Sequence, residues 1–221
     1  MARLWAGFVP FAVLAAIHVV ALALGADQIA TPTKLLLMPL LAAGVVWCLQ
    51  RNSWRMPASR LLLAAIALSW LGDGAGVLFP WAPTVPVMLL WFGVAHLCYI
   101  RLFWHHLRVR PLPVWTLVFA VWWGVLLAVL WPHLGGLLVP VALYGLILGG
   151  TAAAASRCHP LIVVGGLFFL ASDSVLAFRL FVPDAMPDWT SPLVMLTYAL
   201  GQGLMAAGSV IAIRARVTVT T

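Results

Sequence analysis

Long apolar runs separated by short polar loops dominate this chain. Eight of these runs reach about 17 to 23 residues, the length needed to cross the hydrocarbon core of a bilayer as an α-helix. The predicted spans are residues 5–24, 33–49, 60–79, 84–104, 113–131, 134–155, 161–182 and 192–213. We therefore predict an all-α polytopic membrane bundle of about eight transmembrane helices, forming one domain over residues 1–221.

The amino-acid composition also indicates a protein that lies in a lipid bilayer. The chain is 65% hydrophobic and 8% charged, with a mean hydropathy of +1.11. So few polar side chains cannot cover a water-soluble globule, and the chain is predicted to be an integral membrane protein. The net charge of +7 does not indicate a nucleic-acid partner, because the basic residues lie in short loops and form no continuous stripe.

The distribution of Lys and Arg predicts the orientation. Ten of the twelve fall on one side if both termini are cytoplasmic: Arg3, Arg51, Arg55, Arg60, Arg101, Arg108, Arg110, Arg157, Arg214 and Arg216. The other side carries Asp27, Asp184 and Asp188, with Lys34 and Arg179 as its cations. We predict cytoplasmic termini. The short loops and the lack of a eukaryotic sorting signal favour a bacterial inner membrane.

Two acids stand out against the apolar spans. The chain contains no Glu, and of its five Asp only Asp73, in SWLGDGAG, and Asp173, in LASDSVLAF, lie deep in predicted spans. A charged side chain at the centre of a transmembrane helix costs about 2.5 to 3.5 kcal/mol on insertion scales. Three interpretations remain open at this point: an interhelical structural bond, an ion or proton pathway, and catalysis.

Other polar side chains share the layer of these acids. Helical rise places Asp73 about 9 Å and Asp173 about 13 Å below the non-cytoplasmic ends of their spans. The neighbouring polar residues on inward stripes are His96, Tyr99, Tyr198 and Gln202. Lys34 and Arg179 lie above them, near the mouth. We predict one cleft that opens away from the cytoplasm, although hydrogen bonding between helices and snorkelling anchors explain the same residues without a function.

An internal repeat is compatible with the spacing. Asp73 and Asp173 occupy equivalent points of spans three and seven, and Pro39 and Pro140 occupy nearly equivalent points of spans two and six. An offset of four spans would make the two halves parallel. A four-plus-four parallel repeat is therefore one prediction for the architecture.

The motifs around these residues resemble those of a known family. The segments TPTKLLLMPLL (31–41), ALSWLGD (67–73), FGVAHLCYIRLF (92–103), GGLFFLASDSVLAFRLF (165–181) and TYALGQGLM (197–205) occur in the order typical of the YhhN family of membrane proteins, which includes lysoplasmalogenases. The resemblance covers nearly the whole chain. It implies an eight-helix enzyme that cleaves the vinyl ether bond of lysoplasmalogen, giving a fatty aldehyde and a glycerophospho-head group.

The resemblance singles out Asp73 and Asp173 as catalytic, which agrees with the chemistry. Vinyl ether hydrolysis needs an acid that protonates carbon and a base that deprotonates water, and two carboxyls in one apolar cleft can supply both states. Lys34 and Arg179 would suit the lipid phosphate. We assign His96, Tyr99, Tyr198 and Gln202 to substrate binding, as groups that orient water or the glycerol hydroxyl.

No cofactor is required by this chemistry. The three cysteines lack C-x-x-C spacing, and no His or Cys cluster indicates a metal site. The predicted partners are a lysophospholipid substrate and membrane lipid, while the oligomeric state is left open.

Two alternatives remain beside the hydrolase. Paired intramembrane acids also suit an ion- or proton-coupled carrier or channel. The second alternative is a related lipid-handling protein whose substrate is not a plasmalogen. Conventional hydrolases are disfavoured, because the chain has no G-x-S-x-G, H-E-x-x-H or P-loop motif.

Overall fold

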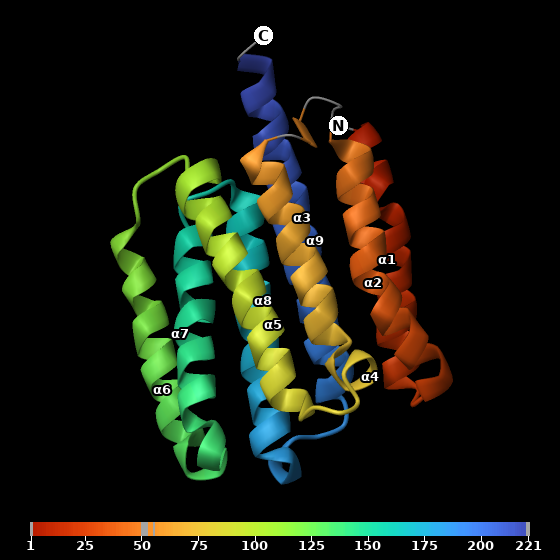
Figure 1. Ribbon diagram of the computed structural model, residues 1–221, viewed down its shortest axis with the longest axis vertical. Helices are drawn as coiled ribbons and strands as arrows, with labels where there is room; N and C mark the ends of the chain where they lie inside the picture. Colours follow the sequence, from red (N-terminus) through yellow and green to blue (C-terminus); the bar gives the residue numbers. More distant parts are fainter. Residues whose placement is uncertain (1, 50–52, 55, 220–221) are drawn as a thin grey trace.

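The computed structural model describes residues 2–49, 53–54 and 56–219 (Figure 1). The helices of this part of the chain are α1 Ala2–Ala23, α2 Asp27–Cys48, α3 Pro57–Asp73, α4 Ala75–Leu78, α5 Thr84–Arg101, α6 Val118–Leu134, α7 Leu138–Ala155, α8 Pro160–Phe181 and α9 Thr190–Val219. The described residues contain no strand. The prediction of an all-α membrane bundle is confirmed.

The eight predicted spans correspond to the eight long helices of the described chain. By length and hydropathy alone, six helical stretches qualify as membrane spans, and one of them, Val114–Ala155, contains both α6 and α7. The chain reverses between these two helices at Gly135, whose φ of +49° lies in the region that favours glycine. The remaining helix, α3, has 17 residues, which is the short end of the range for a membrane span.

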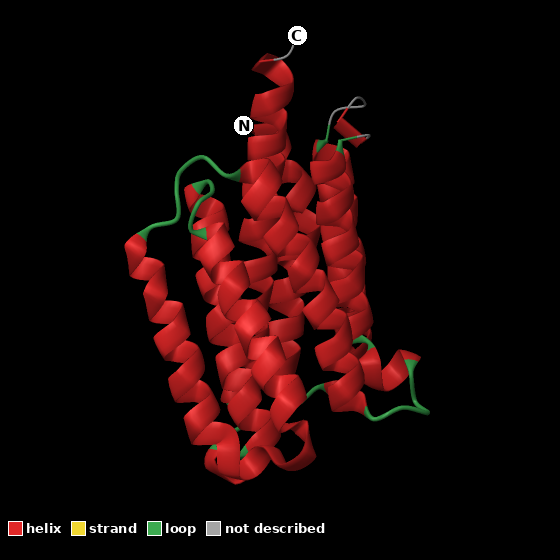
Figure 2. Ribbon diagram, turned by 60° about the vertical axis from the view of Figure 1, so that its left-hand side comes forward, coloured by secondary structure: helices red, strands yellow, loops and turns green. Residues whose placement is uncertain are grey.

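The long helices run alternately up and down, so both ends of the chain lie at the same end of the bundle (Figure 1). The turned view in Figure 2 shows the same up-and-down layout, with connecting loops at the two ends. The short helix Pro183–Ala185, which contains Asp184, lies at the end opposite the termini (Figure 1). This arrangement agrees with an even number of spans. Arg51 and Arg55, two of the cations behind the orientation, lie outside the described residues.

The predicted third span is wrong in one respect. It was expected to continue to residue 79, but α3 ends at Asp73 and a separate four-residue helix follows Gly74. The Gly74 amide closes the last turn by bonding to the carbonyl of Trp70. Three glycines in SWLGDGAG favour this break, because glycine weakens a continuous helix. Asp73 therefore lies at a helix end and not within the span.

Close backbone contact holds α8 against α9. A Cβ added at Gly165 would lie 2.7 Å from the backbone nitrogen of Met205, and one added at Gly201 would lie 2.9 Å from that of Phe169. Small residues let transmembrane helices approach in this way, and van der Waals packing then stabilises the pair. This contact fixes the acid of α8 relative to the polar residues of α9.

We expect residue 184 to be inaccessible from the cytoplasm and residue 109 to be accessible. Residue 184 lies in the connection between α8 and α9, and residue 109 lies in the connection between α5 and α6 at the other end of the bundle. The Val109 side chain is 69% exposed. With the three native cysteines replaced by Ala, a membrane-impermeant maleimide added to cytoplasmic-side-out vesicles should label Val109→Cys and leave Asp184→Cys unlabelled. Labelling of Asp184→Cys from that side would contradict the predicted orientation.

Candidate functional site

Asp73 is held by a tyrosine from another helix. The Tyr198 hydroxyl donates a hydrogen bond of 2.6 Å to Oδ2 of Asp73. Tyr198 belongs to α9 and is only 4% exposed, so the carboxyl is bound inside the bundle. A buried carboxyl needs such a partner, because apolar surroundings do not replace its hydration. The bond also fixes the end of α3 against α9.

An amide extends this contact into a network. The Gln202 Oε1 atom accepts a bond of 2.6 Å from the Tyr99 hydroxyl, while its Nε2 donates to Ser69 Oγ at 3.0 Å and to the Tyr198 hydroxyl at 3.4 Å. Gln202 is fully buried. These bonds join α3, α5 and α9 around Asp73. The structure thus brings together Asp73, Tyr198, Gln202 and Tyr99, four of the residues predicted for the site.

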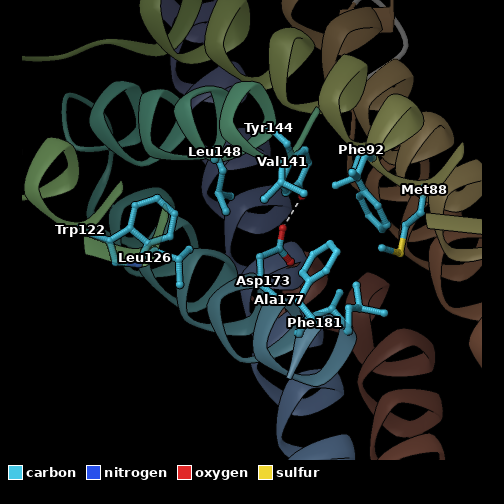
Figure 3. Close-up of a pocket in the computed structure, with 14 residues that line it drawn as sticks. Met88, Phe92, Trp122, Leu126, Val141, Tyr144, Leu148, Asp173, Ala177 and Phe181 are labelled. Atoms are coloured by element: carbon cyan, nitrogen blue, oxygen red, sulfur yellow. Dashed lines mark hydrogen bonds between the residues drawn. The ribbon is translucent and has the colours of Figure 1, made fainter. Parts of the chain in front are cut away.

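Asp173 lies on the wall of a mainly apolar groove. The Tyr144 hydroxyl of α7 donates a hydrogen bond to Oδ2 of Asp173, and Figure 3 shows the two side chains pointing toward each other. The groove lies between α5, α6, α7 and α8 and has a cavity volume of about 50 Å³. The apolar side chains labelled in Figure 3 line this groove: Met88, Phe92, Trp122, Leu126, Val141, Leu148, Ala177 and Phe181. A chain of methylene groups would suit this lining.

The two acids are neighbours with different partners. The structure contains no hydrogen bond between the two carboxyls, and each accepts a bond from its own tyrosine. They remain close enough for the charge of Asp73 to act on Asp173 and on Tyr144. The tyrosines come from α7 and α9, which are not equivalent positions in a four-plus-four scheme. The four-plus-four repeat of the helices stays a prediction, and the two tyrosine–aspartate hydrogen bonds do not follow it.

His96 presents an acceptor to the same interior. Its Nδ1 lies 3.1 Å from Thr151 Oγ1, and the Thr151 hydroxyl donates to the carbonyl of Ile147. With the single hydrogen of this hydroxyl on the Ile147 carbonyl, Nδ1 of His96 is the donor in this pair. Nε2 of the neutral ring then carries a lone pair, and it is buried without a hydrogen-bond partner among the described residues.

Aromatic contacts place His96 beside the acids. Its ring centroid lies 4.6 Å from that of Phe169 and 5.9 Å from that of Tyr144, the partner of Asp173. Phe169 also packs on Tyr198, the partner of Asp73, at 5.3 Å. His96 therefore belongs to the layer predicted from the sequence, with Phe169 packed between it and the Asp73 contact.

Lys34 and Arg179 line one pocket between α1, α2, α8 and α9, with a cavity volume of about 240 Å³. Leu176 borders both this pocket and the groove of Asp173, so the two hollows are adjacent. Lys34 is also close enough to act electrostatically on Asp73. The structure brings the two predicted cations together next to the acids. Arg179 does not bend back to Asp173; it donates to Thr190 Oγ1 and to the carbonyl of Pro187.

A proline fixes the helix that carries Lys34. Pro39 has no amide hydrogen, so the carbonyl of Leu35 one turn earlier lacks its normal helical partner. The indole of Trp70 donates to this carbonyl at 2.9 Å. Because Trp70 precedes Asp73 by three residues, this bond places Lys34 next to the end of α3.

Comparison with protein-family models gives a match over most of the chain. The model described as the YhhN family covers residues 29–209. The chain belongs to the YhhN family. No match was found among curated proteins or among solved structures.

The segment that matches the YhhN family contains every residue predicted for the site. It also contains three site residues that sequence reasoning missed: Tyr144, Ser69 and Thr151. One signal was available for Tyr144. The chain has only three tyrosines, all three lie in apolar spans, and all three enter this site.

Removal of the central amide should destabilise this YhhN protein. Gln202→Leu leaves the hydroxyls of Tyr99, Tyr198 and Ser69 without that partner, and interhelical bonds of this kind contribute about 1 to 2 kcal/mol at most. We expect a clearly lower thermal unfolding midpoint in detergent. The control is Ser209→Ala on the same helix, where the hydroxyl bonds only within α9, to the carbonyl of Met205. Equal midpoints for the two variants would argue against a stabilising network.

Proposed function

We propose that this protein hydrolyses the vinyl ether bond of lysoplasmalogen, releasing a fatty aldehyde and a glycerophospho-head group. The observation that carries the proposal is a pair of tyrosine-bound carboxyls, Asp73 and Asp173, of which Asp173 lines a mainly apolar groove next to the pocket of Lys34 and Arg179. Membership of the YhhN family is compatible with this activity. A single-chain lipid has the matching order of parts: phosphate, glycerol, vinyl ether and hydrocarbon chain.

Asp173 is the better candidate for the general acid, because it lines the groove that suits the hydrocarbon chain. Protonation must occur at the β-carbon, the first chain atom beyond the ether-linked carbon. Tyr144 donates to Oδ2 of Asp173, which leaves Oδ1 to carry the proton. A proton acid held beside an apolar chain can then deliver that proton to carbon.

Asp73 has the complementary role. Proton transfer to carbon leaves an oxocarbenium ion, and an ionised carboxylate nearby stabilises this cation. Asp73 then takes a proton from the attacking water, whose oxygen bonds to the cationic carbon and gives a hemiacetal. The Tyr198 and Gln202 contacts hold the carboxylate in place for both steps.

The hemiacetal collapses with the roles reversed. Asp173, now ionised, accepts the hemiacetal hydroxyl proton, while Asp73, now protonated, donates to the glycerol oxygen as the carbon–oxygen bond breaks. One water is consumed and both acids return to their starting states. His96 Nε2 is an acceptor near this layer and suits the second hydrogen of the water or a glycerol hydroxyl.

The pocket of Lys34 and Arg179 would bind the phosphate. Guanidinium and ammonium groups form charge-assisted bonds to phosphate oxygens. The adjacency of this pocket to the Asp173 groove, through Leu176, supports binding of the phosphate in one hollow and of the chain in the other. We also propose that the host membrane is the bacterial inner membrane.

The assay that tests the function measures aldehyde release from lysoplasmalogen by the purified protein. The ester-linked lysophospholipid with the same head group serves as the control substrate and should release none. Proton or cation flux in liposomes without aldehyde release would replace the hydrolase by the carrier. Turnover of the ester lipid instead would replace it by a different lipid enzyme.

We expect Asp73→Asn and Asp173→Asn each to lower the catalytic rate by about 10²- to 10⁴-fold, the range of general acid–base catalysis. Asn preserves the shape and can still accept the tyrosine bond, but it cannot exchange a proton. The double variant should be little worse than either single one, since residues that act as a unit are not additive. Asp188→Asn, in a loop, is the control and should keep full activity. Normal turnover by both single variants would contradict the mechanism.

Lys34→Met should raise KM by about tenfold or more and change kcat less, because the phosphate contact is nearly the same in the ground and transition states. Arg60→Gln, which removes a cation from the opposite end of the bundle, is the matched control. An unchanged KM in Lys34→Met would show that this lysine only anchors the helix at the membrane surface.

A further inference from the structure

The pocket of Lys34 and Arg179 also contains a negative charge. Asp27, the first residue of α2, lines it together with the two cations. Within the described residues, Asp27 forms no ion pair with Lys34 or Arg179. The pocket is thus lined by two cations and one anion that do not form an ion pair with each other. A ligand that carries both signs would pair with each.

His18 adds a second acceptor. It lines the same pocket and is 2% exposed. Its Nδ1 lies 2.9 Å from Thr33 Oγ1, and the Thr33 hydroxyl donates to the carbonyl of Ile29 at 2.6 Å. With the Thr33 hydrogen on the Ile29 carbonyl, Nδ1 is the donor, and Nε2 of the neutral ring is an acceptor that has no partner among the described residues. Buried acceptors of this kind are normally satisfied, so a ligand donor is expected there.

The two halves of the pocket define the head group. Lys34 and Arg179 donate hydrogen bonds and suit a phosphate, whereas Asp27 and His18 accept them and suit an ammonium with N–H groups. Quaternary ammonium groups have no N–H and are bound by aromatic cages. None of the described residues that line this pocket is Phe, Tyr or Trp. The lining therefore favours a primary ammonium over choline.

We propose that this pocket selects a phosphoethanolamine head group and that Asp27 binds its ammonium. The inference rests on the proposed function, because it takes the ligand to be a lysophospholipid. It goes beyond the family assignment, since His18 and Asp27 both precede the matched segment 29–209. Asp27 is exposed at the end of a helix, so its replacement should leave the fold intact.

The experiment measures binding of three non-cleavable probes to the full chain in nanodiscs. The probes are 1-O-alkyl lysolipids with a saturated ether bond and a phosphoethanolamine, phosphocholine or bare phosphate head group. We expect the ethanolamine probe to bind about tenfold more tightly than the choline probe, as one charge-assisted bond would give. Asp27→Asn should remove this preference by weakening only the ethanolamine probe. Asp27→Glu should retain it, and the control Asp188→Asn should match the wild type.

The outcomes separate this inference from the proposed function. Equal binding of the ethanolamine and choline probes, or a preference that survives Asp27→Asn, would overturn the role of Asp27 and leave the hydrolase proposal standing. Failure of all three probes to bind would count against the phosphate pocket and thus against both proposals. Because no probe contains a vinyl ether, none of these results depends on turnover.

Discussion

The structure depends on satisfying two carboxyl groups inside an apolar bundle. Neither acid has an ion-pair partner among the described residues; each is bound by a tyrosine hydroxyl from a different helix. Apolar surroundings do not replace the hydration of a buried carboxyl, so hydrogen-bond donors of the protein stabilise it. Each bond therefore constrains two helices at once: α3 with α9 through Asp73, and α8 with α7 through Asp173. The helix arrangement around the site follows from these two pairs.

Features that weaken single helices strengthen the contacts between them. Pro39 removes a helical bond in α2, and Trp70 of α3 donates to the carbonyl that is freed. Gly165 and Gly201 lower helix propensity, yet they let α8 and α9 meet at their backbones. The break at Gly74 ends α3 at Asp73 and so presents that carboxyl at a helix end. In each case a feature that destabilises one helix also positions a site residue relative to another helix.

Much of this site was predictable from depth and periodicity. Asp73 and Asp173 stand out because ionisable groups are rare in apolar spans, and the stripe of His96 and Tyr99 follows from helical spacing. What spacing cannot show is which helices become neighbours. Contacts such as α5 with α7 and α1 with α9 join helices distant in sequence. Tyr144 was missed although its helix directly precedes that of Asp173, because spacing does not show which faces of two helices meet. The end of α3 was placed six residues too late because the apolar run continues past the glycines that end the helix.

The inequality of the two acid environments has a mechanistic consequence. Two identical carboxyls would not distinguish the step that needs an acid from the step that needs a base. Here Asp173 faces the apolar groove, whereas Asp73 faces the hydrogen-bonded network and the charge of Lys34. Neighbouring positive charge favours an ionised carboxylate, and an apolar wall favours a neutral one. The proposed mechanism therefore puts the proton on Asp173 and the negative charge on Asp73 before the substrate binds, which is the state from which protonation of carbon would begin.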